Sequence, residues 1–409
     1  MKRTIKLAVV AALALGATSA FATNGSAMIG MGAKTRGMGG VGIGVGHGAE
    51  SALSNPALIT TIKSDHEISF GGTLFMPSVK TTNDMGVGGA TTEKSDADFF
   101  VIPSVSVANK VNDNFYWGVG MWGTGGLGVD YRDTPLMTAG GNHMKMVTSL
   151  QNMQFGLPLV YTVNNFAIGI TPIVQYTALD INYDSTPMGG PTGAGVADDV
   201  SLGYNIGLSY ETDGITVGAV YKSEIESDIK DVLSNAINPM LGGGNTYDNN
   251  KISAPAEMGV GISYKMSEHT IAFDYKRILW EDAETYKDFG WEDQNVYAVG
   301  YEYATDGWAL RAGYQYAKSA VQDNTGKGLY LDTVGPAGLT NTFNLLGFPG
   351  TQESHITLGG TYAFNETLSL DLAAVFGLEN KETFGNFVGQ DIETKHSEQS
   401  YSVQLNYAF

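Results

Sequence analysis

The chain has 409 residues, of which 43% are hydrophobic and only 16% are charged, with 54 glycines, 21 tyrosines and 17 phenylalanines. This mixture is rich in residues that favour strands and turns and poor in strong helix formers, so it predicts an all-β fold. The formal net charge of −19 argues against nucleic acid or anionic lipid surfaces as partners. Because there is no cysteine, disulfides, thiolate metal ligands and thiol nucleophiles are excluded.

Residues 1–22 have the order of a secretory signal peptide. Three cations at positions 2, 3 and 6 precede an apolar run over residues 7–15, and the small-residue sequence Ala20-Phe21-Ala22 follows. The alternative is a membrane anchor, but the run is much shorter than the ~20 residues that a spanning helix needs. We therefore predict cleavage after Ala22, which removes three cations and no anion and changes the formal charge from −19 to −22.

Residues 23–65 form a Gly-rich segment of a different kind. Nine glycines lie between positions 30 and 48, and the sequence Asn55-Pro56-Ala57 comes shortly after them. A flexible linker is one interpretation. Because no stretch here is long enough to cross a membrane as a strand and the segment leads directly into the first such stretch, we instead predict a hatch that plugs a barrel lumen.

Residues 66–409 repeat one pattern of alternating apolar and polar residues over ~10 positions, followed by a turn or a polar loop. In the last such stretch one face carries Tyr401, Val403, Leu405, Tyr407 and Phe409, and the other carries Ser400, Ser402, Gln404 and Asn406. A soluble sandwich would have a dry inner face, whereas polar residues suit a wet lumen. The pattern predicts a transmembrane antiparallel β-barrel of about fourteen strands. The expected strands are residues 66–80, 98–108, 115–126, 150–163, 166–183, 200–211, 215–230, 252–265, 269–281, 293–304, 308–321, 354–364, 367–378 and 396–409.

The connections between these strands alternate in length. Turns of a few residues, such as Asn164-Asn165 and Thr212-Asp213-Gly214, alternate with long stretches over residues 184–199, 231–251 and 322–352. In bacterial barrels the short turns are periplasmic and the long loops extracellular. Both chain termini are then expected on the periplasmic side of the outer membrane.

Several segments resemble the FadL/TodX family of outer-membrane transporters for long-chain fatty acids and hydrocarbons. They are the Gly-rich stretch that ends in Asn55-Pro56-Ala57, and residues 220–225, 254–261 and 273–280. The resemblance implies a monomeric fourteen-stranded barrel, plugged by its hatch, that needs no cofactor and catalyses no reaction. It also implies passive transport: a hydrophobic small molecule is captured between outer loops, passes to a pocket near the hatch, and leaves sideways into outer-membrane lipid through an opening at a kinked third strand.

Two sets of residues match these implied sites. Gly123, Gly125 and Gly126 interrupt the third strand where a kink or bulge would need residues without Cβ, although an ordinary extracellular turn is the alternative. The loop from residue 232 to 241 carries apolar side chains in an acidic exterior, which suits ligand capture or packing against a neighbouring loop. The candidate capture residues are Leu233, Ile237, Met240 and Leu241.

A fatty acid would also need a cation for its carboxylate. The candidates that face the lumen are Lys222, Lys276 and Arg311, each of which could instead pair with a lumen acid such as Asp274 or Glu302. The family often places helices in the loop at residues 184–199. Here that loop is short and rich in glycine, proline and aspartate, which leaves room for smaller hydrocarbons.

Other functions find little support. Residues 37–42 satisfy a G-x-G-x-x-G string, but no βαβ unit surrounds it, and the six histidines lack metal-ligand spacing. We therefore predict neither a metal site nor an enzyme. The nearest alternative function is a general diffusion porin without hydrophobic specificity, against which the plug segment and the apolar loop argue.

Overall fold

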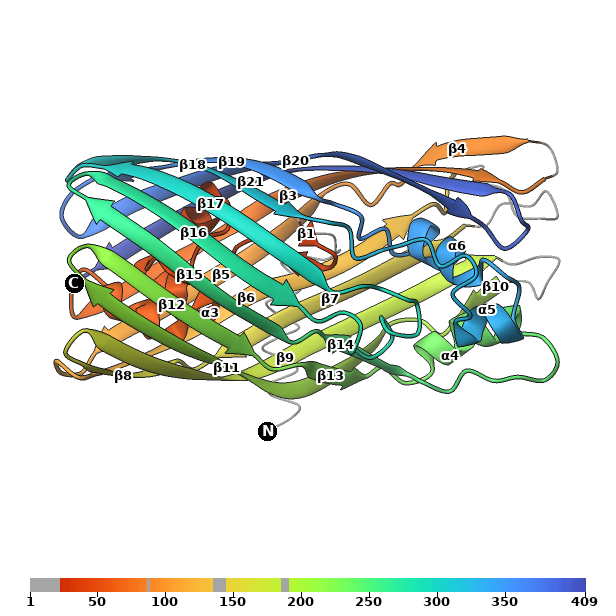
Figure 1. The fold of residues 1–409 in the computed structure, drawn as a ribbon, viewed down its shortest axis with the longest axis horizontal. Helices are drawn as coiled ribbons and strands as arrows, with labels where there is room; N and C mark the ends of the chain where they lie inside the picture. The colour runs from red at the N-terminus through yellow and green to blue at the C-terminus, as the bar shows by residue number, and fades with distance from the viewer. Residues whose placement is uncertain (1–22, 87–88, 135–144, 185–190) are drawn as a thin grey trace.

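The computed structural model describes residues 23–86, 89–134, 145–184 and 191–409. Within these residues the wall is a closed antiparallel barrel of fourteen strands, as predicted, in which the last strand pairs with the first (Figure 1). The fourth strand of the wall is made of two pieces, β7 and β8. The wall strands are β3 (His66–Asp84), β5 (Phe100–Lys110), β6 (Phe115–Asp130), β7 (Val147–Gly156), β8 (Leu159–Val163), β9 (Phe166–Asp184), β11 (Ala197–Thr212), β12 (Ile215–Lys222), β15 (Glu257–Met266), β16 (His269–Ile278), β17 (Gln294–Ala304), β18 (Trp308–Ala317), β19 (Ser354–Ala363), β20 (Leu368–Gly385) and β21 (Asp391–Ala408).

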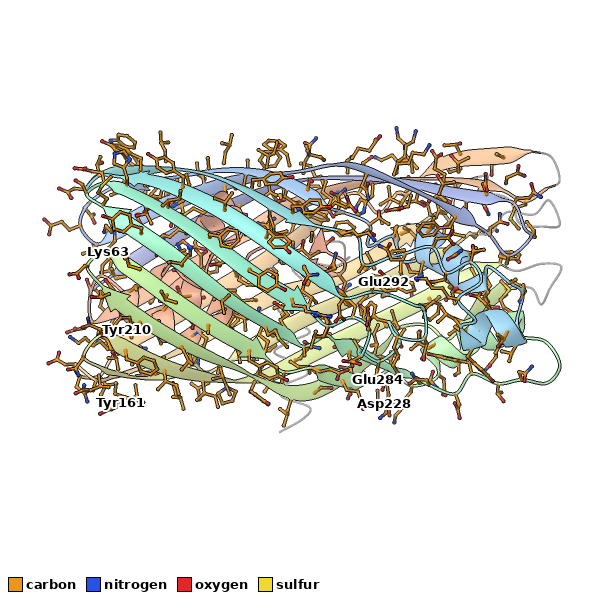
Figure 2. The ribbon with its side chains drawn as sticks, viewed as in Figure 1. Lys63, Tyr161, Tyr210, Asp228, Glu284 and Glu292 are labelled. Atoms are coloured by element: carbon orange, nitrogen blue, oxygen red, sulfur yellow. The ribbon has the colours of Figure 1, made fainter. Side chains whose placement is uncertain are left out.

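The two faces of each wall strand follow the alternation of the sequence. On β21, Tyr401, Val403 and Leu405 are exposed on the outside, whereas Ser402 and Gln404 are buried in the lumen. Figure 2 shows Tyr161 and Tyr210 on the outer surface near the short turns, and the acids Glu284 and Asp228 near the long loops. An apolar outside with a polar inside is the arrangement of a barrel whose solvent is lipid.

The short turns predicted from the sequence are confirmed at one end of the barrel (Figure 1). Asp213 and Gly214 connect β11 to β12 with φ of 48° and 78°, the backbone that two-residue hairpins prefer because it matches the strand twist. Asn164 and Ser267, at two further turns, also have positive φ of 52° each. The long connections lie at the opposite end.

Two expected strands were placed wrongly. The chain leaves the wall after Lys222 and re-enters it at Glu257, so residues 215–230 and 252–265 are not single wall strands. In between, β13 (Ile225–Asp228) and β14 (Lys251–Ala254) pair only with each other. Pro255 separates β14 from β15 because it has no N–H for a ladder hydrogen bond, and Ile225 turns inward over Gly203 of β11.

Residues 23–62 fold inside the barrel in short pieces (Figure 1). These pieces are β1 (Thr23–Asn24), β2 (Ala27–Met28), α2 (Ala33–Gly37), η1 (Gly48–Glu50), α3 (Ser51–Ser54) and η2 (Pro56–Thr61). Wall glycines let this segment approach the strands closely: a Cβ at Gly218 would lie 1.7 Å from the carbonyl oxygen of Ile43, and one at Gly261 would lie 2.4 Å from the amide of Gly44.

The long connections pack into an apolar crown at the other end of the barrel, which we define as residues 225–254, 279–293 and 318–350. It contains β13, β14, α4 (Val232–Ile237), η3 (Asn238–Met240), α5 (Tyr330–Val334) and α6 (Leu339–Leu346). The smaller strands β4 (Ala90–Lys94) and β10 (Pro191–Gly193) extend β3 and β9 nearby. None of the helices in the described residues has the length and apolar character to cross a membrane.

Candidate functional site

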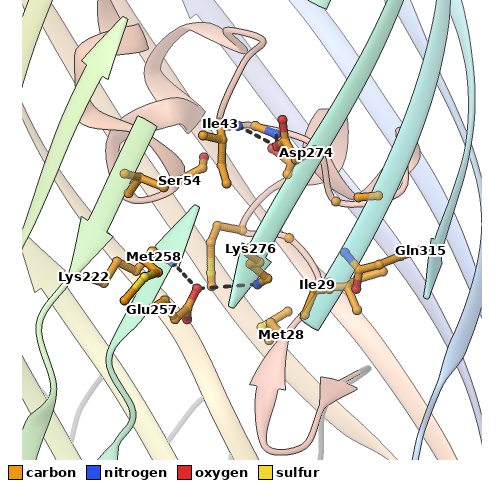
Figure 3. A pocket seen from close by; sticks show the side chains of 18 residues that line it. Met28, Ile29, Ile43, Ser54, Lys222, Glu257, Met258, Asp274, Lys276 and Gln315 are labelled. Atoms are coloured by element: carbon orange, nitrogen blue, oxygen red, sulfur yellow. Dashed lines mark hydrogen bonds and ion pairs between the residues drawn. The ribbon is translucent and has the colours of Figure 1, made fainter. Parts of the chain in front are cut away.

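A small cavity of about 40 Å³ lies between residues 28–54 and the wall strands β12 and β15 to β18 (Figure 3). Most of its lining is apolar, and Lys222, Glu257 and Lys276 form a polar group on one side of it. A pocket that is mainly apolar with a few placed polar groups is the usual form of a small-molecule site. The apolar lining includes Met28, Ile29, Met31, Ile43, Val220, Val296 and Ala298.

The polar end holds two lysines that share one carboxylate. Glu257 Oε2 lies 3.4 Å from Lys222 Nζ and 3.5 Å from Lys276 Nζ (Figure 3). The three side chains come from adjacent strands, since Lys222 pairs with Glu257 across β12 and β15 and Lys276 lies on β16. All three are mostly buried. These three side chains together carry one positive charge, while Asp274 in the same cavity lining supplies a second carboxylate.

Asp274, on the same strand as Lys276, does not neutralise that charge through a direct contact. Its carboxylate accepts backbone N–H bonds from Gly42 and Ile43 at 2.7 Å each and from Gly44 at 3.1 Å. Three N–H donors satisfy a buried carboxylate that would otherwise be expensive to bury. Asp274 therefore attaches the Gly-rich segment to the wall.

Asn55, Pro56 and Ala57 form a second attachment. The Asn55 side chain caps η2 by accepting from the Ala57 N–H at 3.1 Å, and its Nδ2 donates to the carbonyls of Ile43 at 2.9 Å and Leu208 at 3.1 Å. Pro56 occupies the first position of η2, where no N–H is needed. One asparagine thus joins its own turn, the Gly-rich loop and strand β11. The gating role of these residues stays a prediction.

Gly123, Gly125 and Gly126 lie inside β6 rather than at a turn. The β6–β7 ladder shifts register between Gly123 and Gly125, which marks a bulge. The β5–β6 ladder ends at the pair Ser104 and Trp122, and beyond it β6 is buried and pairs with β2 through Ala27 and Gly125. The predicted interruption of the third strand is present, and its role as a lateral opening stays a prediction.

The apolar residues of loop 232–241 are buried, which agrees with the alternative of packing against neighbouring loops. Leu233, Ile237 and Met240 have at most 5% of their surface exposed, and Leu241 is half-buried against them. They form part of α4 and η3 and pack on the crown, because apolar side chains next to other apolar loops fold together rather than face water. Leu233 also lines a small apolar cavity of the crown together with Phe289 and Phe343.

Tyr286 and Trp291 line the crown cavity and form an aromatic trio with Trp280. The ring centroids of Trp280, Tyr286 and Trp291 lie 4.6 to 5.1 Å apart. The trio contacts the start of the internal segment, since the Tyr286 hydroxyl is 3.1 Å from the Ser26 hydroxyl and a Cβ at Gly25 would lie 2.7 Å from Trp280. Burial raises the pKa of Tyr286 to about 12, so its hydroxyl stays protonated.

Arg311 is not part of this site. It donates to Glu302 at 2.7 Å and lies 3.5 Å from Asp371, which also has Lys34 at 3.7 Å. This network faces a different cavity, toward the short-turn end of the barrel. The structure therefore brings Lys222 and Lys276 together and leaves the third candidate cation apart, paired with lumen acids.

Comparison with known proteins identifies the family. Residues 7–328 match the model of the outer membrane protein transport protein family (OMPP1/FadL/TodX). The chain belongs to this family. FadL/TodX membership places the protein in the outer membrane and makes it a transport protein rather than an enzyme.

Individual relatives agree in length and fold. The chain is 23% identical to a long-chain fatty acid transport protein of Escherichia coli O6:H1 and to a 47 kDa outer membrane protein of Pasteurella multocida, over 90% of this chain and 92% of each relative. The toluene transporter TodX of Pseudomonas putida superposes with a TM-score of 0.66 and 20% identity, over 93% of this chain and 99% of its own. A Pseudomonas aeruginosa FadL homologue superposes with a TM-score of 0.68 and 16% identity, over 94% of this chain and 100% of its own. At these identities the two structures show that the fold is shared.

Sequence reasoning missed several lining residues of this FadL/TodX protein. Met28, Ile29 and Ile43 lie in the Gly-rich segment, where no strand or helix period indicates which side chains face a cavity. Glu257 could have been found, because the strand alternation places it on the lumen face beside Lys222 and Lys276. The trio Trp280, Tyr286 and Trp291 comes from a loop and carried no periodic signal.

Proposed function

We propose that this protein carries hydrophobic molecules with an anionic head group, of which long-chain fatty acids are the model, passively across the outer membrane. The observation that carries the proposal is the apolar cavity with Lys222 and Lys276 sharing only Glu257. A ligand carboxylate would accept charge-assisted hydrogen bonds from the two lysines, and its hydrocarbon chain would lie along Met28, Ile29 and Ile43. An uncharged hydrocarbon would use the apolar part alone.

The path begins in the crown and ends at the third strand. Ligand enters the apolar crown cavity beside Leu233. The aromatic trio then moves away from Ser26, which lets the ligand pass into the lumen cavity. Exit is sideways at the β6 bulge around Gly123, Gly125 and Gly126, where the ladder to β5 ends. The segment that contains Asn55 acts as the hatch, and outer-membrane lipid receives the ligand from a single monomeric barrel.

The physical reason for a sideways exit is solvation. Each CH₂ group that leaves water gains ~0.8 kcal/mol, so release of a long chain into the aqueous periplasm is strongly uphill, whereas release into lipid is nearly level. No energy source is then required, and the hatch regulates access only. A general diffusion porin, the alternative, needs an open aqueous lumen, and residues 23–62 occupy the lumen instead.

The test is uptake of radiolabelled oleate and toluene by cells that lack their own transporter, with the wild type or with Lys276→Met. Without Lys276 the remaining Lys222 and Glu257 neutralise each other, so oleate uptake should fall roughly tenfold, equivalent to about 1.4 kcal/mol, while toluene uptake is unchanged. Lys110→Met, which removes a partly exposed lysine paired with Asp113 at a short turn, is the matched control.

Three outcomes separate the alternatives. Equal loss of both substrates in Lys276→Met would show that the lysine is structural and would refute the head-group proposal. Uptake of toluene alone by the wild type would favour small hydrocarbons, whereas uptake of hydrophilic solutes alone would favour a porin. An Asn55→Ala variant with normal barrel content should lose uptake of both hydrophobic substrates if the segment is a working hatch.

A further inference from the structure

A buried carboxylate receives the first residue that follows the predicted cleavage site. Glu398, on β21, has a fully buried side chain whose Oε2 accepts the backbone N–H of Thr23 at 3.1 Å and whose Oε1 accepts the Thr23 hydroxyl at 3.2 Å. Thr23 is itself buried, with 1% of its surface exposed. These two contacts join positions 375 residues apart in the sequence.

The surroundings of Glu398 contain polar atoms that have no partner among the described residues. His355 Nε2 and His396 Nε2 each lie 3.3 Å from the carboxylate, but His355 Nδ1 and Gln352 Oε1 are buried and unpaired. Gln352 Oε1 and Glu398 Oε2 both lie close over Gly377, because a Cβ there would lie 2.9 and 3.2 Å from them. Two acceptor oxygens are thus brought near one glycine of β20.

Several basic side chains surround this carboxylate. Arg36, buried in α2, is attracted to both Glu398 and Glu50. His396 Nε2 lies 3.3 Å from Glu398 and its Nδ1 lies 2.9 Å from the Pro349 carbonyl oxygen, so both ring nitrogens face acceptors. Buried charges are tolerated best when they are paired, and the surroundings of Glu398 suit a carboxylate that stays ionised.

We propose that this site binds the α-ammonium group of the processed chain, which begins at Thr23 after cleavage behind Ala22. A peptide nitrogen has one proton, whereas an α-ammonium has three and a positive charge, with an ordinary pKa near ~7.7. Its charge pairs with the Glu398 carboxylate, whose Oε2 lies 3.1 Å from this nitrogen. Removal of the signal peptide thereby creates the ion pair that attaches the start of the chain to β19 and β21, whatever the ligand transported.

The first measurement is the intact mass of the protein purified from outer membranes, which should correspond to a chain that starts at Thr23. The second is the rate at which formaldehyde and a borohydride reductant methylate the α-amine at pH 7, followed by mass spectrometry of the N-terminal peptide. The buried ion pair should slow this reaction at least about tenfold in the folded barrel relative to the SDS-denatured chain.

Glu398→Gln should raise the rate in the folded barrel toward the denatured value, and Glu302→Gln, which removes a lumen carboxylate paired with Arg311, should leave it unchanged. Heat-modifiable gel mobility shows that each variant has folded. A different N-terminal residue, or equal α-amine rates in folded and denatured wild type, would overturn the proposal even if Glu398→Gln fails to fold. So would a Glu398→Gln barrel that reacts as slowly as the wild type.

Discussion

The two ends of the barrel interior are filled by different physical means. At the hatch, backbone groups of residues 23–62 meet the wall directly, through acceptors such as Asp274 and through glycines such as Gly218. In the crown, side chains such as Leu233 and Phe343 pack on each other with few directional bonds. The hatch is thus held by a small number of specific contacts, and the crown by many similar ones.

This difference determines how each region should respond to change. Hydrogen bonds to buried groups are lost all at once when the partner is removed, and the unsatisfied donors then carry the full desolvation penalty. Apolar packing is lost in proportion to the surface removed. The contacts of residues 23–62 should therefore break in single steps, whereas those of the crown should weaken gradually.

The largest effect is expected from Gly218→Val. Its Cβ would lie 1.7 Å from the Ile43 carbonyl oxygen, which cannot shift without releasing Asn55, so the hatch should be excluded from the lumen while the wall still closes. Outer-membrane permeability to a large hydrophilic antibiotic should rise at least about tenfold, because overpacking of this kind exceeds the ~1–3 kcal/mol of an ordinary core insertion. Gly307→Val, at an exposed turn with open space around its Cβ, should have no effect. Normal permeability in a folded Gly218→Val barrel would contradict the close-approach argument.

A smaller but still abrupt effect is expected from Asp274→Ala. The amides of Gly42, Ile43 and Gly44 would lose their common acceptor, because alanine has no side-chain oxygen. Each buried donor left unpaired costs ~1–3 kcal/mol. Hydrogen exchange at these three amides should accelerate on the order of a hundredfold, while exchange in α6 stays as in the wild type. Asp306→Ala, at an exposed turn, serves as the control. Unchanged exchange at residues 42–44 would mean that the wall does not hold this loop through Asp274.

The smallest and most graded effect is expected in the crown at Ile237, which is 1% exposed. Ile237→Val should lower the local stability of α4 by about 1 kcal/mol and Ile237→Ala by about 3 kcal/mol, in proportion to the groups removed. Hydrogen exchange of the α4 amides measures both changes, with the amides of residues 42–44 as an internal reference. If Ile237→Val lowered the local stability of α4 as much as Ile237→Ala, the crown, like the hatch, would depend on specific fit.

The wall could be predicted from the sequence far better than what fills it. Strand alternation and turns such as Asp213-Gly214 are local signals, so strand number and direction followed from them. The detour at β13 and β14 was missed because residues 225–228 alternate like a wall strand, and only Pro255 indicated a break. Lys276 and Arg311 look alike in sequence, yet their partners, Glu257 and Glu302, are set by register across strands. Apolar loop residues such as Leu233 gave no indication of the other loops that cover them.

The connection between the two ends of the chain has a consequence for the order of biogenesis. The amide of Ala33 donates to Gln404 and Arg36 donates to Ser400, so a segment made early in synthesis is completed by the last strand of the wall. Contacts that close such long loops form late and slowly. Residues 23–62 should therefore reach their final position only after β21 has paired with β3. A barrel that lacks this last strand would have an open wall and would also lack the contacts that hold the internal segment in the lumen.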